Sequence, residues 1–174
     1  MKKGFRFAIR FLNIAFGLGV VYSVARMLFC FWMLLAYHSD WEQKRQYFDA
    51  LDIALLYKGD ITSFNVIMMA ESLDAVLSIL FYILALKLVK RVDIYNFFNP
   101  EIPKMIFRMS ALVLVMTIVY WAEVFYTETF VHKELVVSTQ ITEGSDLVTA
   151  AVLFLMALLF EKSIELKQEN ELTI

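Results

Sequence analysis

The chain has 174 residues, of which 60% are hydrophobic, and it carries a formal net charge of −2 and a single cysteine, Cys30. This apolar fraction exceeds the ~45–50% that is usual for a soluble domain. The near-neutral charge, without a Lys/Arg-rich run, gives no support for direct nucleic-acid binding, and one cysteine excludes an intrachain disulfide.

Four apolar segments follow one another along the chain. At ~1.5 Å of rise per residue, each can cross a hydrocarbon core of ~30 Å as a helix, and helices are the only open-ended structure that spans a bilayer. The predicted spans are residues 9–37, 64–89, 105–126 and 141–160.

The distribution of basic residues predicts the orientation of these spans. Eleven Lys and Arg residues lie in the two termini and the middle loop, whereas four lie in the other two loops. By the positive-inside rule, both termini should face the cytoplasm. The sequence therefore predicts an all-α membrane protein with one domain, residues 1–174, in which four transmembrane helices form a bundle in contact with the lipid bilayer.

The first outer loop, residues 38–63, also has a helical pattern. Its side chains Trp41, Phe48, Leu51 and Leu55 recur at helical spacing, with charged residues on the other faces. This pattern predicts an amphipathic helix lying at the outer membrane interface. The alternative is a short helix that only caps the bundle.

Polar side chains within the spans share the outer half of the predicted membrane. Arg26 lies roughly 16 Å from the outer end of its span, and Asp74 lies at a similar depth, roughly 15 Å inside the second span. We expect these two to pair, and because one arginine faces four acids, another acid should hold a proton or a cation. The predicted intramembrane polar cluster is Arg26, Glu71, Asp74, Ser78, Glu123, Asp146 and Thr149.

A structural interpretation of this cluster stands beside the functional one. A buried Arg–Asp pair with hydroxyl neighbours can serve only to fix the register of two helices. Glu123 and Asp146 are placed near enough to the outer boundary to be ordinary rim residues that meet water.

The sequence lacks the motifs of common enzymes and metal sites. Its two histidines, His38 and His132, fall in different outer loops, which disfavours a metal site. There is no phosphate-binding loop, nucleophile elbow, Cys-x-x-Cys or His-Glu-x-x-His motif. We therefore expect a protein that is not an enzyme and has neither cofactor nor metal. Four helices can close a bundle alone or expose Phe-rich faces to further copies of the chain. The sequence is therefore compatible with both a monomer and a homo-oligomer.

The polar C-terminal segment, residues 161–174, is predicted to continue the last span as a helical stalk on the cytoplasmic side. Good helix formers extend to Glu169, and Lys167 and Glu171 are four residues apart. The sequence Ile164-Glu-Leu-Lys-Gln-Glu-Asn-Glu-Leu-Thr-Ile174 resembles the tail of the DUF2975 family of small four-helix bacterial membrane proteins. The inner loop Asn96-Phe-Phe-Asn-Pro-Glu-Ile-Pro-Lys-Met-Ile-Phe-Arg108 is similar to that family's turn before its third helix, whereas Ser163 replaces the family's usual glycine.

The resemblance to this family implies a location and a partner. It implies a multi-pass protein of the bacterial cytoplasmic (inner) membrane with no established activity. Because members are often encoded beside small helix-turn-helix regulators, it also implies a cytoplasmic helix-turn-helix transcription regulator as the partner. Carried onto this chain, the partner-binding tail is Glu169, Asn170, Glu171, Leu172, Thr173 and Ile174.

Two functions follow as hypotheses. The first is a non-enzymatic signalling or regulatory membrane protein, whose outer polar faces sense a proton, cation, small ligand or envelope state and whose tail engages the regulator. The alternative is a small transporter or ion-conducting oligomer that uses the Arg26–Asp74 pair. The restriction of polar residues to the outer half favours a blind pocket over a continuous path, and so favours the first.

Overall fold

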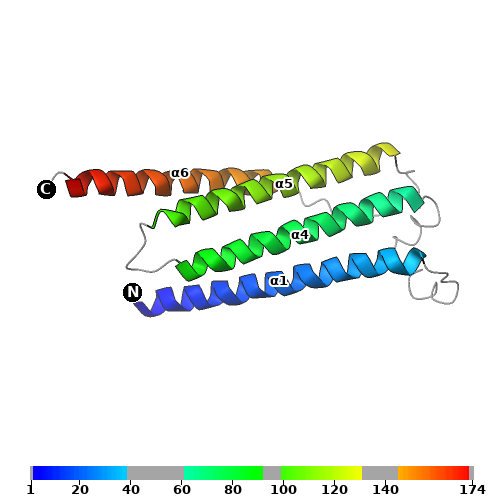
Figure 1. The fold of residues 1–174 in the computed structure, drawn as a ribbon, viewed down its shortest axis with the longest axis horizontal. Coiled ribbons are helices and arrows are strands. Elements are labelled where there is room, and N and C mark those ends of the chain that lie inside the picture. The colour runs from blue at the N-terminus through cyan, green and yellow to red at the C-terminus, as the bar shows by residue number, and fades with distance from the viewer. Residues whose placement is uncertain (1, 39–60, 92–98, 131–144, 173–174) are drawn as a thin grey trace.

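Four long helices make up nearly all of the described chain. The computed structural model describes residues 2–38, 61–91, 99–130 and 145–172 (Figure 1). By length and composition all four helices can cross a membrane, which marks the chain as a multi-pass membrane protein. The helices are α1 (Lys2–His38), α4 (Ile61–Arg91), α5 (Glu101–Phe130) and α6 (Ser145–Leu172).

The helices extend beyond the apolar segments from which they were predicted. α5 begins at Glu101, four residues before the predicted span, because Asn99 caps it: the Asn99 side-chain Oδ1 accepts the Glu101 N–H at 2.9 Å, and the Asn99 carbonyl accepts the Ile102 N–H at 3.0 Å. Pro103 is tolerated in this first turn, where its missing N–H would have had no partner within the helix. The apolar span therefore starts inside an already formed helix.

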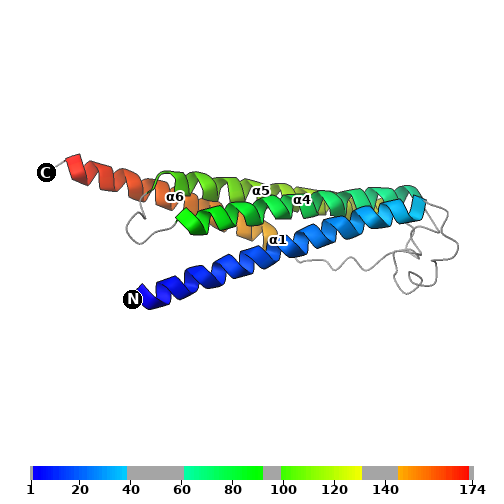
Figure 2. The same cartoon turned by 60° about the horizontal axis from the view of Figure 1, so that its bottom comes forward.

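Each described helix packs mainly against the next described helix. α1 lies antiparallel to α4, α4 to α5, and α5 to α6, so that α4 and α5 are central and α1 and α6 are peripheral (Figures 1 and 2). We call the end at which α1 and α5 finish the outer end, following the predicted orientation, and the opposite end the inner end. The side of α1 away from α4 exposes large apolar side chains such as Ile14, Leu18 and Val21, as a lipid-facing surface does.

α6 is displaced toward the inner end relative to its neighbour. The Ser110 hydroxyl of α5 donates a hydrogen bond of 2.8 Å to the Ala150 carbonyl of α6, which fixes the register of the two helices. Ser145, where α6 begins, is therefore level with the middle of α5, and roughly 22 Å of α5 toward Phe130 has no α6 beside it. At the inner end, this register makes α6 project roughly 20 Å past the start of α5. The projecting end is visible in Figure 1.

The inner half of the molecule has an apolar core. Ile102 and Ile106 of α5 are buried against Ala157 of α6. Further apolar side chains pack around them, and the rings of Phe107 and Phe154 lie 5.8 Å apart. The small side chain of Ala157 allows α5 and α6 to approach closely. The residues packed around this core are Leu88, Leu153 and Phe160.

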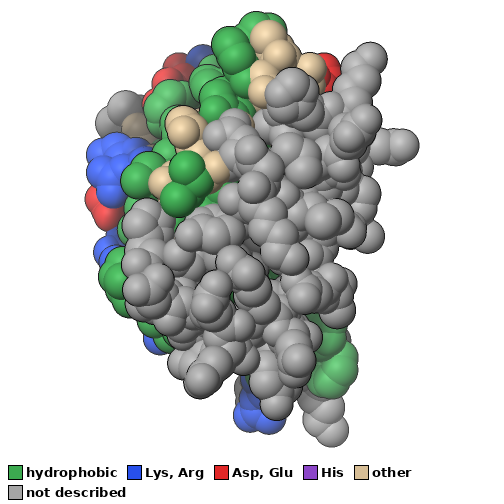
Figure 3. All heavy atoms as spheres, turned by 90° about the vertical axis from the view of Figure 1, so that its right-hand side faces the viewer, with side chains coloured by type: hydrophobic (Ala, Val, Ile, Leu, Met, Phe, Trp, Pro, Cys, Tyr) green, Lys and Arg blue, Asp and Glu red, His purple; other side chains and the backbone are tan. Residues whose placement is uncertain are grey.

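Two of the predicted segments lie largely or wholly outside the residues that the structure describes. The predicted amphipathic helix falls almost wholly in residues 39–60, which lie outside them, and Ile61–Ser63 belong to the first turn of α4. Figure 3 shows the molecule from its outer end, with hydrophobic side chains of the described helices visible around the residues drawn in grey. The predicted start of the fourth span, residues 141–144, also lies outside the described part of the chain.

Candidate functional site

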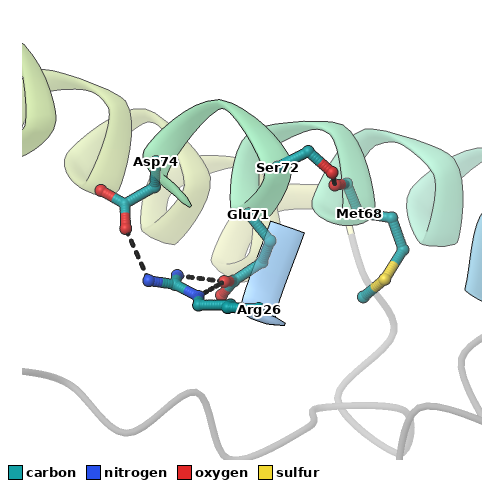
Figure 4. Close-up of polar contacts among 5 residues, drawn as sticks. All are labelled: Arg26, Met68, Glu71, Ser72 and Asp74. Atoms are coloured by element: carbon teal, nitrogen blue, oxygen red, sulfur yellow. Dashed lines mark hydrogen bonds and ion pairs between the residues drawn. The ribbon is translucent and has the colours of Figure 1, made fainter. Parts of the chain in front are cut away.

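The most polar contact between the described helices joins α1 to α4. The guanidinium of Arg26 lies between two carboxylates of α4 (Figure 4). Its Nη1 donates to Asp74 Oδ2 at 2.8 Å, its Nε donates to Glu71 Oε2 at 3.1 Å, and its Nη2 also donates to Glu71 Oε2. We call Arg26, Glu71 and Asp74 the charged triad. The sequence predicted the pair with Asp74, and the structure adds Glu71 on the other side of the guanidinium.

The local sequence explains why these three side chains meet. Glu71 and Asp74 are three residues apart on α4 and so share a face, and the planar guanidinium has enough donors for both. α1 approaches α4 closely because Gly19 has no side chain: a Cβ added there would lie 2.6 Å from Cε1 of Tyr82. Ser23, one turn before Arg26, is buried in the same contact.

The charged triad lies deep along the spans and is only partly covered. Arg26 is roughly 18 Å from the end of α1 at His38, near the middle of a ~30 Å hydrocarbon core. The side chains of Arg26, Glu71 and Asp74 are 31%, 30% and 20% exposed. Charged groups facing acyl chains at this depth are strongly unfavourable. Their open side must therefore face water or another polar group rather than lipid.

Between the triad and the outer end, several polar groups lie between α4 and α5. Ser63 Oγ and Tyr126 Oη are 3.3 Å apart and share a hydrogen bond. Three other oxygen atoms are buried without a hydrogen-bond partner among the described residues: Asn65 Oδ1, Tyr120 Oη and Glu123 Oε1. Buried polar atoms normally have a hydrogen-bond partner. The three unpaired oxygens could therefore bind a polar group that the described helices do not supply.

The predicted cluster is thus assembled only in part. Ser78 is buried on α4, and Glu123 is partly buried on α5. Thr149 is exposed on α6, and Asp146 lies in the first turn of α6, level with the middle of α5, although its side chain is not described. Sequence reasoning missed Asn65 and Ser63. An amide inside a predicted span is the signal that would have identified Asn65.

The predicted partner-binding tail falls on the projecting end of α6. The helix continues without a break past Phe160 to Leu172, and Glu169 and Asn170 are exposed. Lys162 Nζ donates to Glu165 Oε2 at 2.7 Å, one turn along the same face. Glu171 and Leu172 complete the helix, although their side chains are not described, and Thr173 and Ile174 lie outside the described residues.

Metal ligands do not gather in the described part of the chain. Within these residues, no group of three or more His, Cys, Asp or Glu side chains is placed to hold a metal ion. Cys30 is a buried free thiol, one turn from Arg26 on α1. His38 ends α1, and His132 lies outside the described residues.

No protein-family model, curated protein or solved structure matches this chain.

Proposed function

We propose that this chain is a non-enzymatic regulatory protein of the bacterial cytoplasmic membrane, with both termini in the cytoplasm. In this proposal the outer polar region, which consists of the charged triad together with Asn65, Tyr120 and Glu123, receives a signal. The projecting end of α6 engages a small cytoplasmic helix-turn-helix transcription regulator. The resemblance of the C-terminal segment to the DUF2975 family supports the choice of partner. The distribution of Lys and Arg supports the orientation.

The projection of α6 is the observation that carries the proposal. A helix end that projects roughly 20 Å past the start of its neighbour, with a surface that is largely exposed and charged, presents a segment to which a soluble protein can bind. α6 also packs on α5, which holds Tyr120 and Glu123 in the outer region. A displacement of α5 would therefore move the projecting end.

The outer polar region is the proposed input. The charged triad contains one cation and two anions, and Glu123 adds a further carboxyl group nearby, so protons and small cations are the signals favoured by charge. Ile102, Ile106 and Ala157 make the inner half of the contact between α5 and α6 apolar. This arrangement fits a blind site that reports on the outer side.

A pull-down from native membranes tests the proposal. The full-length chain is compared with a chain that ends at Lys167, and with a control in which Gln168–Ile174 are present in scrambled order. Recovery of a helix-turn-helix regulator with the full-length chain alone is the expected result. If the scrambled or shortened chain recovers the same regulator equally well, or if the full-length chain recovers none, the proposed role of the tail is wrong.

A second function, a small transporter or ion-conducting oligomer, is favoured by the position of the charged triad. Ionisable side chains at this depth commonly mark ion pathways. In liposomes, this alternative predicts that Asp74→Asn changes proton or cation flux, whereas Ser72→Ala, whose hydroxyl donates to the Met68 carbonyl of its own helix, does not. No flux with either variant or with the unaltered protein would reject transport of the ions tested.

A further inference from the structure

The inner ends of α4 and α5 bring several basic side chains around one carboxylate. Arg91 Nη1 of α4 donates to Glu101 Oε2 of α5 at 2.5 Å, which ties the last residue of one helix to the first residue of the other. Lys104 and Arg108 also attract the Glu101 carboxylate electrostatically. Lys87 lies one turn before Arg91 and shares its face of α4. We call Lys87, Arg91, Lys104 and Arg108 the inner basic patch.

The inner basic patch has an excess of positive charge and is open to its surroundings. All four basic side chains are exposed. Among the last two turns of α4 and the first two turns of α5, Glu101 is the only acidic residue. Within these turns of α4 and α5, one carboxylate is surrounded by four cations, so the patch carries a net positive charge that favours the binding of an anion.

An exposed apolar surface continues from the patch toward the middle of the molecule. On α4, Ile83 and Leu80 precede Lys87 by one and two turns, and both are exposed. On α5, Ala111 and Val115 follow Arg108 by one and two turns and are exposed as well. The same faces of α4 and α5 are therefore basic at the inner end and apolar from there toward the middle of the molecule.

We propose that the inner basic patch binds the headgroup of an anionic phospholipid. The phosphate diester lies among Lys104, Arg108 and Arg91, and the acyl chains lie along the apolar surface on α4 and α5. Basic sites between transmembrane helices at the cytoplasmic boundary are suited to anionic headgroups. A lipid is favoured over a free phosphate because the apolar surface offers contacts that only a lipid can use. The site requires neither the proposed partner nor the proposed signal.

Lipid binding to the purified full-length chain tests this site. Native mass spectrometry measures the retention of phosphatidylglycerol and of phosphatidylcholine by the unaltered protein, by Lys104→Gln/Arg108→Gln, and by Lys162→Gln/Lys167→Gln. The last variant removes two charges from α6 that do not belong to the patch. We expect preferential binding of phosphatidylglycerol, a loss of roughly tenfold in affinity for the patch variant alone, and weaker binding at high salt.

Three outcomes of the retention measurements would overturn the proposal. These are equal retention of both lipids by the unaltered protein, unchanged phosphatidylglycerol binding by the patch variant, and an equal loss in the α6 variant. Soluble glycerol phosphate serves as the competing anion. If it displaces the lipid at similar concentration, the acyl chains do not contribute and the site is a phosphate site, not a lipid site. A melting temperature for the patch variant in phosphatidylcholine equal to that of the unaltered protein establishes that the variant is folded.

Discussion

Arg26 holds two carboxylates at a depth where none of the three charges would be stable alone. The guanidinium bonds to both Glu71 and Asp74, so removing it leaves two like charges facing each other. Breaking a buried pair from one side costs more than replacing the whole pair by neutral groups, because the remaining charge keeps its desolvation penalty. The charged triad is therefore best tested by comparing partial with complete removal.

We predict that Arg26→Gln destabilises the protein by about 1–3 kcal/mol, below the full value for buried pairs because the side chains are partly exposed. The triple variant Arg26→Met/Glu71→Gln/Asp74→Asn should recover most of this loss. Thermal unfolding in detergent measures both. If the triple variant is as unstable as Arg26→Gln, the attraction between the charged groups holds α1 against α4. The explanation by unpaired charge in Arg26→Gln would then be wrong.

The sequence predicted part of the charged triad and not its geometry. Helical spacing placed Glu71 and Asp74 on one face, and depth selected Asp74 as the partner of Arg26. Depth alone has a resolution of about one turn, whereas the guanidinium reaches over a full turn and bonds to both carboxylates. Asn65 carries no charge and lies one residue inside the predicted span, so neither charge nor depth distinguishes it in the sequence.

At the scale of elements, the contact between α1 and α4 depends on a glycine at one position. Gly19 faces the ring of Tyr82, and Phe16 packs on the same ring with centroids 6.4 Å apart. Gly17, two residues earlier, has open space where its Cβ would lie. The two glycines therefore make a matched pair for measuring how closely the helices pack.

Gly19→Ala should destabilise the protein by about 1–3 kcal/mol, because Tyr82 must move away from Phe16. Gly17→Ala should be neutral, or stabilising by up to about 1 kcal/mol from helix propensity. The measurement is the difference between the two melting temperatures in the same detergent. Equal melting temperatures for the two variants would contradict the close approach of α1 to Tyr82.

The sequence predicted that the four helices exist, but it did not predict the position of α6 along the axis of α5. Continuous apolar runs identify spans, because the bilayer requires them. The axial position of α6 depends on how Ser110 and Ala150 meet across two helices, and no local pattern in the sequence encodes that register. The start of α6 at Ser145 therefore places Asp146 level with the middle of α5, deeper than its place in the predicted span indicated.

For the whole molecule, the proposed orientation places the inner end of every helix in the cytoplasm. In a Cys30→Ala background, single cysteines at Lys90 and Lys162 should react with a membrane-impermeant maleimide only after permeabilisation. A cysteine at Glu128, exposed near the outer end of α5, should react in intact cells. The opposite pattern would place the projecting end of α6 outside the cell and exclude a cytoplasmic partner.

The nearest-neighbour packing of the helices has a consequence for synthesis. The interhelical polar bonds given above pair α1 with α4, α4 with α5, and α5 with α6, so each of these spans can meet a partner soon after it is synthesised. Arg26 would be the most costly residue to insert alone, and both of its carboxylates arrive with α4, the next described span. The helices α1 and α4 can therefore enter the bilayer as a pair whose charges are already matched.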